Sequence, residues 1–535
     1  QIDYSWEGFQ WMSPTARETM YQQKFHLYRN LTKPSERLYL SFTKAGASGE
    51  EQNPSYLINE IRKLFPEIPV RDIEKEEKPE EKLEMPRSGE ALFLEELGRA
   101  AEGEIDPLFE ELYRWYAAHP EAGIPAETYR KAAFLRCADG VIGRSAASAL
   151  YGDTLKNSAT RLEKYAACAF AHFMEFGLQI RERDQYELKA ADMGTVMHEA
   201  LEKFSKKLQE NGETWKTVTD DTRDRLIEEC VEETMADYGN TIFQSSSRNQ
   251  YRIIRVKRIL KRTVWALQQQ IRQGEFEPGE FEVSFSMEDS LSAINIDLSE
   301  HEKMRLRGRI DRVDLCETDD KVYVKIIDYK TGNTSLDLVA LYYGLQLQLA
   351  VYLDAAVELE QKKHPGKQVE PAGVFYYHID DPMLDQEEDE TDEAWGRRML
   401  KALRMDGLVN ADRKVVELLD RVLEDGTTSD VIPVGKKKDG SYTSYSKVAS
   451  PEQFDVIRTY TRKKVREIGE GIFSGNVKIS PYQRDGATAC AYCEYQGICG
   501  FDQKIQGYEY RKLKGMDTEL LMKAMQEITQ SDQKE

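Results

Sequence analysis

The sequence predicts an α/β fold in which a mixed sheet is flanked by helices, and three observations support this prediction. Two runs, Met304–Leu315 and Val322–Lys330, have the apolar alternation of strands and are separated by turn-forming residues. A helical pattern over Ser335–Val357 leads to a further strand at Gly373–Ile379, as in a strand–helix–strand crossover. Another strand is expected at Phe281–Met287, after helical segments.

The chain is expected to contain two parts, residues 1–146 and 147–535. In the first part, helical patterns surround a strand at Arg37–Lys44 and a following helix at Pro54–Phe65. In the second part, residues 380–450 look like an insertion into the α/β core. Ser450 and Pro451 then open a helix as N-cap and first-turn proline, with Gln453 completing a capping box.

The formal net charge of −21 argues against a uniformly DNA-binding surface, because phosphate contacts need Lys and Arg. Much of the acid lies in runs, Asp72–Glu84 and Asp380–Glu393, which are typical of solvated loops. Basic residues recur in YRIIRVKRILKRTVW from Tyr251, and Lys alternates with Tyr over Gly435–Lys447. Each basic stretch suits either DNA contact or an ordinary solvated surface.

Asp311, Asp328 and Lys330 form the most informative constellation. Residues two apart on a strand face the same side, so Asp328 and Lys330 project together, and a hairpin brings Asp311 alongside Asp328. Paired carboxylates suit Mg²⁺, which lowers the pKa of bound water. The alternative is that these charges are solvated residues flanking a hairpin.

The pattern resembles the RecB-type branch of the PD-(D/E)xK nucleases, with GRID ending at Asp311 and DYK from Asp328 to Lys330. His198, four residues after Gly194, resembles the histidine helix of that branch, and Gln348 and Tyr352 resemble its Gln-x-x-x-Tyr helix. The resemblance implies a restriction-endonuclease-like core. It also implies Mg²⁺ or Mn²⁺ held by His198, Asp311 and Asp328, with Lys330 catalytic and Gln348 and Tyr352 supporting the site or contacting DNA.

Four cysteines form a second constellation. Cys490, Cys493 and Cys499 are closely spaced, and Cys168 supplies a fourth thiolate from 322 positions before Cys490. The layout resembles the iron-sulfur staple of the AddB subunits of AddAB helicase-nucleases and of Cas4 exonucleases, and it implies a 4Fe-4S cluster. Tetrahedral zinc is the chemical alternative, because four cysteines satisfy it as well.

Taken together, the resemblance implies a C-terminal AddB-like fragment: part of a helicase-like domain with a helical linker, then a RecB-type nuclease domain. Its partners would be an AddA-like subunit, as a heterodimer, and DNA, single-stranded at the nuclease site and duplex at the end held by the complex. The sequence lacks a Gly-x-x-x-x-Gly-Lys-Ser/Thr phosphate loop, so ATP hydrolysis is expected in the partner. A stand-alone Cas4-like exonuclease and a non-catalytic DNA-binding scaffold remain the alternatives.

The expected location is the cytoplasm. Seven cysteines, an odd total, do not suit a secreted disulfide framework. No apolar run approaches the roughly 18 residues of a membrane span, so membrane insertion is not expected.

Overall fold

The computed structural model describes residues 14–45, 51–72, 83, 86–103, 107–134, 140–183, 188–238, 243, 245–285, 291–292, 294–299, 302–385 and 390–531. The chain forms two compact units, residues 1–133 and 134–535, and each is described by itself. The boundary expected between residues 146 and 147 falls inside helix α7 (Arg144–Tyr151), which belongs to the second unit.

The first unit is helical in its described residues. Its helices are α1 (Ala16–Leu31), α2 (Tyr56–Leu64), α4 (Pro86–Glu102), α5 (Pro107–Ala118), the short η2 (Pro120–Ala122) and α6 (Ala126–Ala133). Helix α2 confirms the predicted helix, but the strand expected at Arg37–Lys44 is wrong. A strand is stabilised by hydrogen bonds to a neighbouring strand, and none pairs with this segment in residues 14–45 and 51–72. Most of the acidic run from Asp72 lies outside the described residues.

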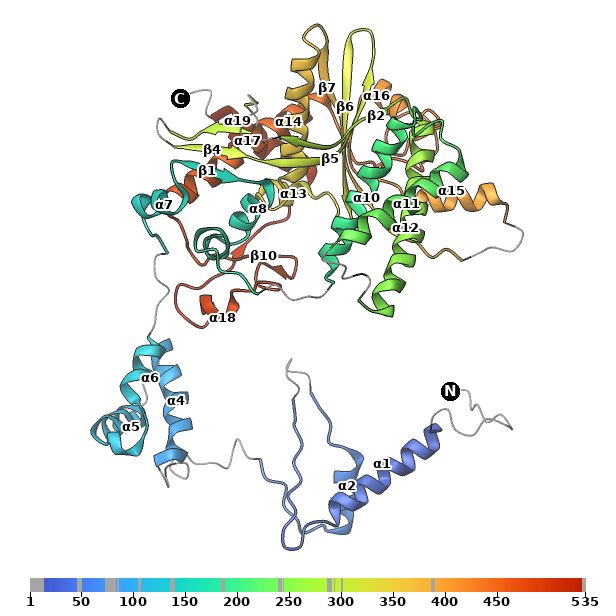
Figure 1. The fold of residues 1–535 in the computed structure, drawn as a ribbon. Helices are drawn as coiled ribbons and strands as arrows, with labels where there is room; N and C mark the ends of the chain where they lie inside the picture. Colours follow the sequence, from blue (N-terminus) through green and yellow to red (C-terminus); the bar gives the residue numbers. More distant parts are fainter. Residues whose placement is uncertain are drawn as a thin grey trace. The chain divides into compact units, whose positions relative to one another are not determined.

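A six-stranded mixed sheet forms the centre of the second unit, as predicted (Figure 1). In spatial order its strands are β2 (Glu277–Phe285), β5 (Gly308–Glu317), β6 (Lys321–Lys330), β7 (Gln368–His378), β8 (Asp406–Asn410) and β9 (Val448–Ala449). Strands β6 and β7 run parallel, with the helices between them making the predicted crossover, and β2, β5 and β6 pair antiparallel.

Helices cover both faces of this sheet (Figure 1). Helices α10 (Ala190–Glu210), α11 (Asp220–Asp237) and α12 (Ser247–Gln273) pack on one face. Helices α8 (Ala159–Ala167), α14 (Gln348–Lys363), α17 (Pro451–Phe473) and α19 (Thr518–Ser531) pack on the other. Along β6, Tyr323 and Ile327 point into the first core, whereas Val324 and Ile326 point into the second. This alternation leaves Asp328 and Lys330 on the α14 side.

Three segments differ from their predicted form. The helix expected at Ser335–Val357 is two helices, α13 (Leu338–Tyr342) and α14, because Gly344 adopts a left-handed conformation between them. The strand expected at Met304–Leu315 divides into β5 and β4 (Lys303–Leu306). Strand β4 belongs to a separate sheet with β1 (Thr154–Asn157) and β3 (Asn295–Asp297).

Residues 380–450 are not simply an insertion, since β8 and β9 extend the main sheet and α15 (Asp392–Ala402) and α16 (Arg413–Leu419) lie between them and β7. These strands are too short to show an alternating pattern. The capping box at Ser450 is confirmed: its hydroxyl accepts the N–H of Gln453, and the Gln453 side chain accepts the N–H of Ser450. None of the described helices has the length and apolar character needed to cross a bilayer.

Candidate active site

Asp311 and Asp328 lie opposite each other on two antiparallel strands. Arg312 of β5 pairs with Ile327 of β6, and the same register places Asp311 opposite Asp328. The backbone N–H of Tyr329 donates to Oδ2 of Asp311 at 2.7 Å, which fixes that carboxylate against β6. Both aspartates are buried, with exposed fractions of 8% and 1%. The predicted convergence of two carboxylates is therefore present.

Lys330 shares a face of β6 with Asp328, as predicted. Its Nζ lies 2.5 Å from Oδ2 of Asp328 and also donates to Oε1 of Gln348 at 3.1 Å. The ammonium group lies 5.4 Å from the ring centroid of Tyr376 on the neighbouring strand. The lysine thus approaches the carboxylate from inside the fold, not from a solvated hairpin edge.

Gln348, the first residue of α14, connects these groups. Its Nε2 donates to Oδ1 of Asp328 at 2.9 Å and lies 3.3 Å from the hydroxyl of Tyr352, one helical turn later. Tyr352 packs edge-on against Phe285 of β2. A Cβ at Gly308 would lie 2.4 Å from Phe285 and 2.9 Å from Tyr352, so the glycine of the GRID motif makes room for both rings.

His198 reaches the site from α10, on the other face of the sheet. Its Nδ1 lies 3.3 Å from Oδ2 of Asp311, and its ring meets that of Tyr329 edge-on. Burial disfavours a charged imidazole, but the Asp311 carboxylate outweighs burial and raises the pKa of His198. The histidine of the Gly-x-x-x-His pattern therefore lies beside the aspartates and not in the apolar core.

Glu282 completes this group and was not predicted from the sequence. It lies on β2 opposite Asp311, and it has a left-handed φ of 51° that interrupts the strand pairing. Arg309 forms an ion pair with its carboxylate, whose side chain is only 5% exposed. Burial, reinforced by Asp311, raises the pKa of Glu282 to about 7. The only signal in the sequence was an acidic residue inside the apolar run FEVSF.

The carboxylates and the imidazole form a ligand set. One donor atom each from His198, Glu282 and Asp311 lies within 4.8 Å of the others. Burial and the neighbouring Asp311 charge raise the pKa of Asp328 to about 6, against the opposing effect of Lys330. Carboxylates brought together in this way repel one another, and a divalent cation would relieve that repulsion. Oxygen-rich sites with one imidazole suit Mg²⁺ or Mn²⁺.

The four predicted cysteines also come together. Cys168 is the C-cap of α8, and Cys493 packs with it against Tyr495. Burial raises the pKa of Cys490, and the nearby thiols of Cys168, Cys493 and Cys499 add to the rise. Arg511 donates to the carbonyl oxygens of Ala166 and Ala167 just before Cys168. Cys137 lies outside the described residues, while Cys230 and Cys316 are buried in the core.

The basic stretch of α12 is largely engaged within the protein. Lys257 and Lys261 pair with Glu232 and Glu228 of α11. Arg258 and Arg262 both pair with Asp381. These ion pairs favour a structural role for this helix over a DNA-lining one.

The Gly435–Lys447 segment forms the predicted turn, with Lys436 bridged to Tyr442 and Gly440 in a left-handed conformation. Lys436 is buried, and the Tyr442 hydroxyl donates to the carbonyl oxygen of Ala411. Tyr445 remains exposed.

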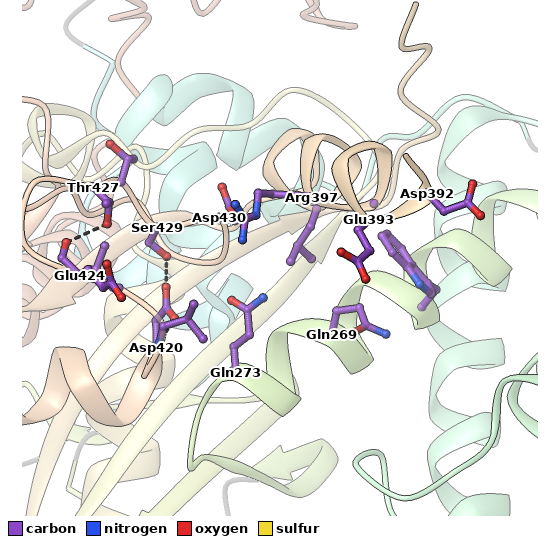
Figure 2. A pocket seen from close by; sticks show the side chains of 16 residues that line it. Gln269, Gln273, Asp392, Glu393, Arg397, Asp420, Glu424, Thr427, Ser429 and Asp430 are labelled. Carbon is purple, nitrogen blue, oxygen red and sulfur yellow. Dashed lines mark hydrogen bonds and ion pairs between the residues drawn. The ribbon is translucent and has the colours of Figure 1, made fainter. Parts of the chain in front are cut away.

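A separate cavity of about 560 Å³ lies between α12, α15 and the 420–430 loop (Figure 2). It is lined mainly by acidic and amide side chains, namely Gln269, Gln273, Asp392, Glu393, Asp420, Glu424 and Asp430, with Arg397 as a cation. Hydrogen bonds from Ser429 to Asp420 and from Thr427 to Glu424 order its loop. None of the residues around Asp311 or Cys168 lines this cavity, and its charge does not suit a phosphate.

Comparison with known proteins agrees with this geometry. The sequence profile described as the PD-(D/E)XK nuclease superfamily matches residues 156–500, which include every residue of both constellations. The chain belongs to the PD-(D/E)XK nuclease superfamily. This membership places the Asp311, Asp328 and Lys330 cluster at the motif from which the superfamily takes its name.

Longer relatives extend the match to nearly the whole chain. The B subunit of the ATP-dependent helicase/deoxyribonuclease of Lachnoclostridium phytofermentans is 42% identical over 95% of this chain and 43% of its own length. The protein of the same name from Alkaliphilus metalliredigens is 34% identical over 96% of this chain and 45% of its own length. The chain therefore spans less than half the length of these relatives.

Proposed function

We propose that this chain carries a metal-dependent DNA exonuclease site and serves as the nuclease subunit of a helicase-nuclease that processes double-strand breaks for recombination. The observation that carries this proposal is the convergence of Asp311, Asp328 and Lys330 in a member of the PD-(D/E)XK nuclease superfamily. The relatives are named as B subunits of a helicase/deoxyribonuclease, and these names support DNA as the substrate.

His198, Glu282, Asp311 and Asp328 would hold Mg²⁺ or Mn²⁺, since their donor atoms already converge. When bound, such an ion supplies a water of lowered pKa and polarises the phosphoryl oxygen. Lys330 stabilises the negative charge that builds on the phosphate, and Gln348 holds Lys330 and Asp328 in one orientation. Tyr352 supports Gln348.

The cysteine site would hold a 4Fe-4S cluster rather than zinc. A tetrahedral zinc with Zn–S bonds of about 2.3 Å keeps its sulfurs about 3.8 Å apart. The group of donors found within 4.8 Å in the described residues is His198, Glu282 and Asp311, and it includes no cysteine. Thiols spread more widely suit a cluster of several irons. A reducing cytoplasm would keep these thiols available.

The proposed partner is an AddA-like helicase subunit in a heterodimer. Both relatives are named as one subunit of an ATP-dependent enzyme, and this chain lacks a phosphate loop of its own. Single-stranded DNA would enter the nuclease site while the complex holds the duplex end. The match across residues 1–133 as well as the nuclease favours this assignment over a Cas4-like enzyme.

The test is cleavage of labelled single-stranded DNA by the anaerobically purified 535-residue chain. We expect degradation of linear DNA in Mg²⁺, none in EDTA, and resistance of circular single-stranded DNA. Asp311→Asn is the matched control, because it keeps the shape of the side chain and removes one charge. Equal cleavage by Asp311→Asn and the parent, or cleavage of circles at the linear rate, would contradict the nuclease site or its exonuclease mode respectively.

A further inference from the structure

Glu163 of α8 contacts the first turn of α14, which lies 185 residues away in the sequence. Its Oε1 accepts the backbone N–H of Leu347 at 2.7 Å and that of Gln348 at 3.0 Å. Helix α14 has no side-chain cap of its own, because Leu347 stands at the N-cap position. The first N–H groups of a helix lack intrahelical partners, so Glu163 supplies what a local Ser or Asp supplies elsewhere.

The helix end that Glu163 holds is the one that carries the site. Gln348 is the first residue of α14, and its side-chain amide contacts both Asp328 and Lys330. A carboxylate on the backbone of Gln348 therefore fixes where that amide group starts. Because the amide is held at both ends, Asp328 and Lys330 are oriented through it.

Keeping a carboxylate at this position is unfavourable in itself. Burial raises the pKa of Glu163 to about 7, and the two backbone N–H donors only partly offset that rise. A hydroxyl or carboxamide at residue 347 would cap the helix without burying an ionisable group. The long-range carboxylate makes more sense as a constraint between two segments than as a cap alone.

We propose that Glu163 is a positioning residue for the nuclease reaction, acting through the backbone of Gln348 on Asp328 and Lys330. The inference rests on the proposed function, because Asp328 and Lys330 matter only if they serve the metal-dependent chemistry. Residues that orient metal ligands in this way typically change metal affinity or activity by about 10- to 100-fold when removed.

The test compares three variants of the full 535-residue chain. Glu163→Ala removes both contacts, whereas Glu163→Gln keeps an oxygen at the Oε1 position, which is the atom that accepts both N–H groups. Asp412→Ala is the control, because Asp412 caps α16, away from the site, by accepting the N–H of Lys414. Each variant is assayed for the Mg²⁺ concentration at half-maximal DNA cleavage, for the KM for DNA, for Mn²⁺ affinity by electron paramagnetic resonance, and for melting temperature.

Glu163→Ala should raise the half-maximal Mg²⁺ concentration and weaken Mn²⁺ binding by at least about tenfold with an unchanged KM for DNA, and Glu163→Gln should stay within about threefold of the parent. Asp412→Ala should lower the melting temperature without changing metal dependence. Parent-like metal dependence in Glu163→Ala would overturn the inference, as would the same loss in Asp412→Ala. An inactive parent would instead refute the proposed function.

Discussion

The ammonium nitrogen of Lys330 lies 2.5 Å from Oδ2 of Asp328, so a proposed metal ligand is already engaged by the proposed catalytic cation. A metal ion that binds Asp328 must share this oxygen with Lys330 or displace it. Lys330 has a second acceptor in Oε1 of Gln348, 3.1 Å away. The lysine can therefore stay at the site when the carboxylate turns to a metal, which suits a group that later meets the phosphate.

Removing either partner should abolish cleavage for different reasons. Asp328→Asn weakens metal binding, whereas Lys330→Ala leaves the ligands and removes charge stabilisation worth a factor of about 10² to 10³ in rate. We expect Lys330→Ala to bind Mn²⁺ at least as tightly as the parent and to cleave DNA slowly. Titration of Mn²⁺ alongside a cleavage assay separates the two effects.

Asp319→Asn is the matched control for this pair. Asp319 lies exposed in the turn between β5 and β6, so it alters charge on the same hairpin without touching the site. It should cleave at the parent rate. Cleavage by Lys330→Ala at that rate would remove Lys330 from the mechanism.

The buried carboxylates predict how stability depends on pH. In the folded protein the pKa of Asp328 is about 6 and that of Glu282 about 7, both raised chiefly by burial, whereas unfolded carboxyls titrate near 4. Between these values the folded state keeps protons that the unfolded state has released. The contribution of both groups to the free energy of unfolding is therefore largest below about pH 4 and is lost as the pH rises through about 7.

The measurement is the melting temperature in EDTA of the parent and of an Asp328→Asn, Glu282→Gln double variant. The variant lacks both titrating groups, so it should gain stability relative to the parent between about pH 5 and pH 8. Added Mg²⁺ should stabilise only the parent, and more at the higher pH, because metal ligands must be deprotonated. A constant difference between the two proteins across this range would contradict the assigned pKa shifts.

Much of the active site was predictable because strand alternation is a local property. The spacing of Asp328 and Lys330 places them on one face whatever surrounds them, and the hairpin brings Asp311 to their side. Glu282 could not be predicted in the same way. Its position depends on an interruption of strand pairing with a left-handed φ, which no local pattern encodes.

The remaining differences have the same origin in long-range contacts. The break between α13 and α14 depends on Gly344 and on Glu163, which holds the start of α14 from another helix. The apolar alternation of Arg37–Lys44 satisfied the local criterion for a strand but found no partner strand in the described part of its unit. Local pattern therefore predicted which residues could act, and tertiary contacts determined which elements formed.

DNA affinity should fall steeply with salt despite the acidic total charge, because phosphate contacts release counterions. With about six to ten such contacts, affinity drops by about 10³ to 10⁵ between 50 and 200 mM salt. A Lys257→Ala, Lys261→Ala variant should keep the parent salt dependence, since both lysines are paired with α11. Fluorescence anisotropy on single-stranded DNA measures both. A flat salt response in the parent would rule out phosphate-dominated binding, and a reduced slope in the variant would place α12 at the DNA.

The cysteine site joins the two ends of the nuclease unit, so its loss should loosen both. Cys168 ends α8, and its three partners follow more than 300 residues later, beyond α17. A cross-link that closes a long loop restrains the unfolded chain and typically stabilises the fold by about 2–4 kcal/mol. Cys168→Ala should therefore melt at a lower temperature than the parent.

Metal analysis of anaerobically purified protein tests the cluster itself. The parent should be brown and contain about four irons per chain, and Cys168→Ala should lose both colour and iron. Cys230→Ala is the control, because Cys230 is a buried core residue far from this group in its contacts. Stoichiometric zinc without iron in the parent would refute the cluster. A full complement of iron in Cys168→Ala would show that the three C-terminal cysteines hold the metal alone, in which case α8 would not be tied to the C-terminal loop through Cys168.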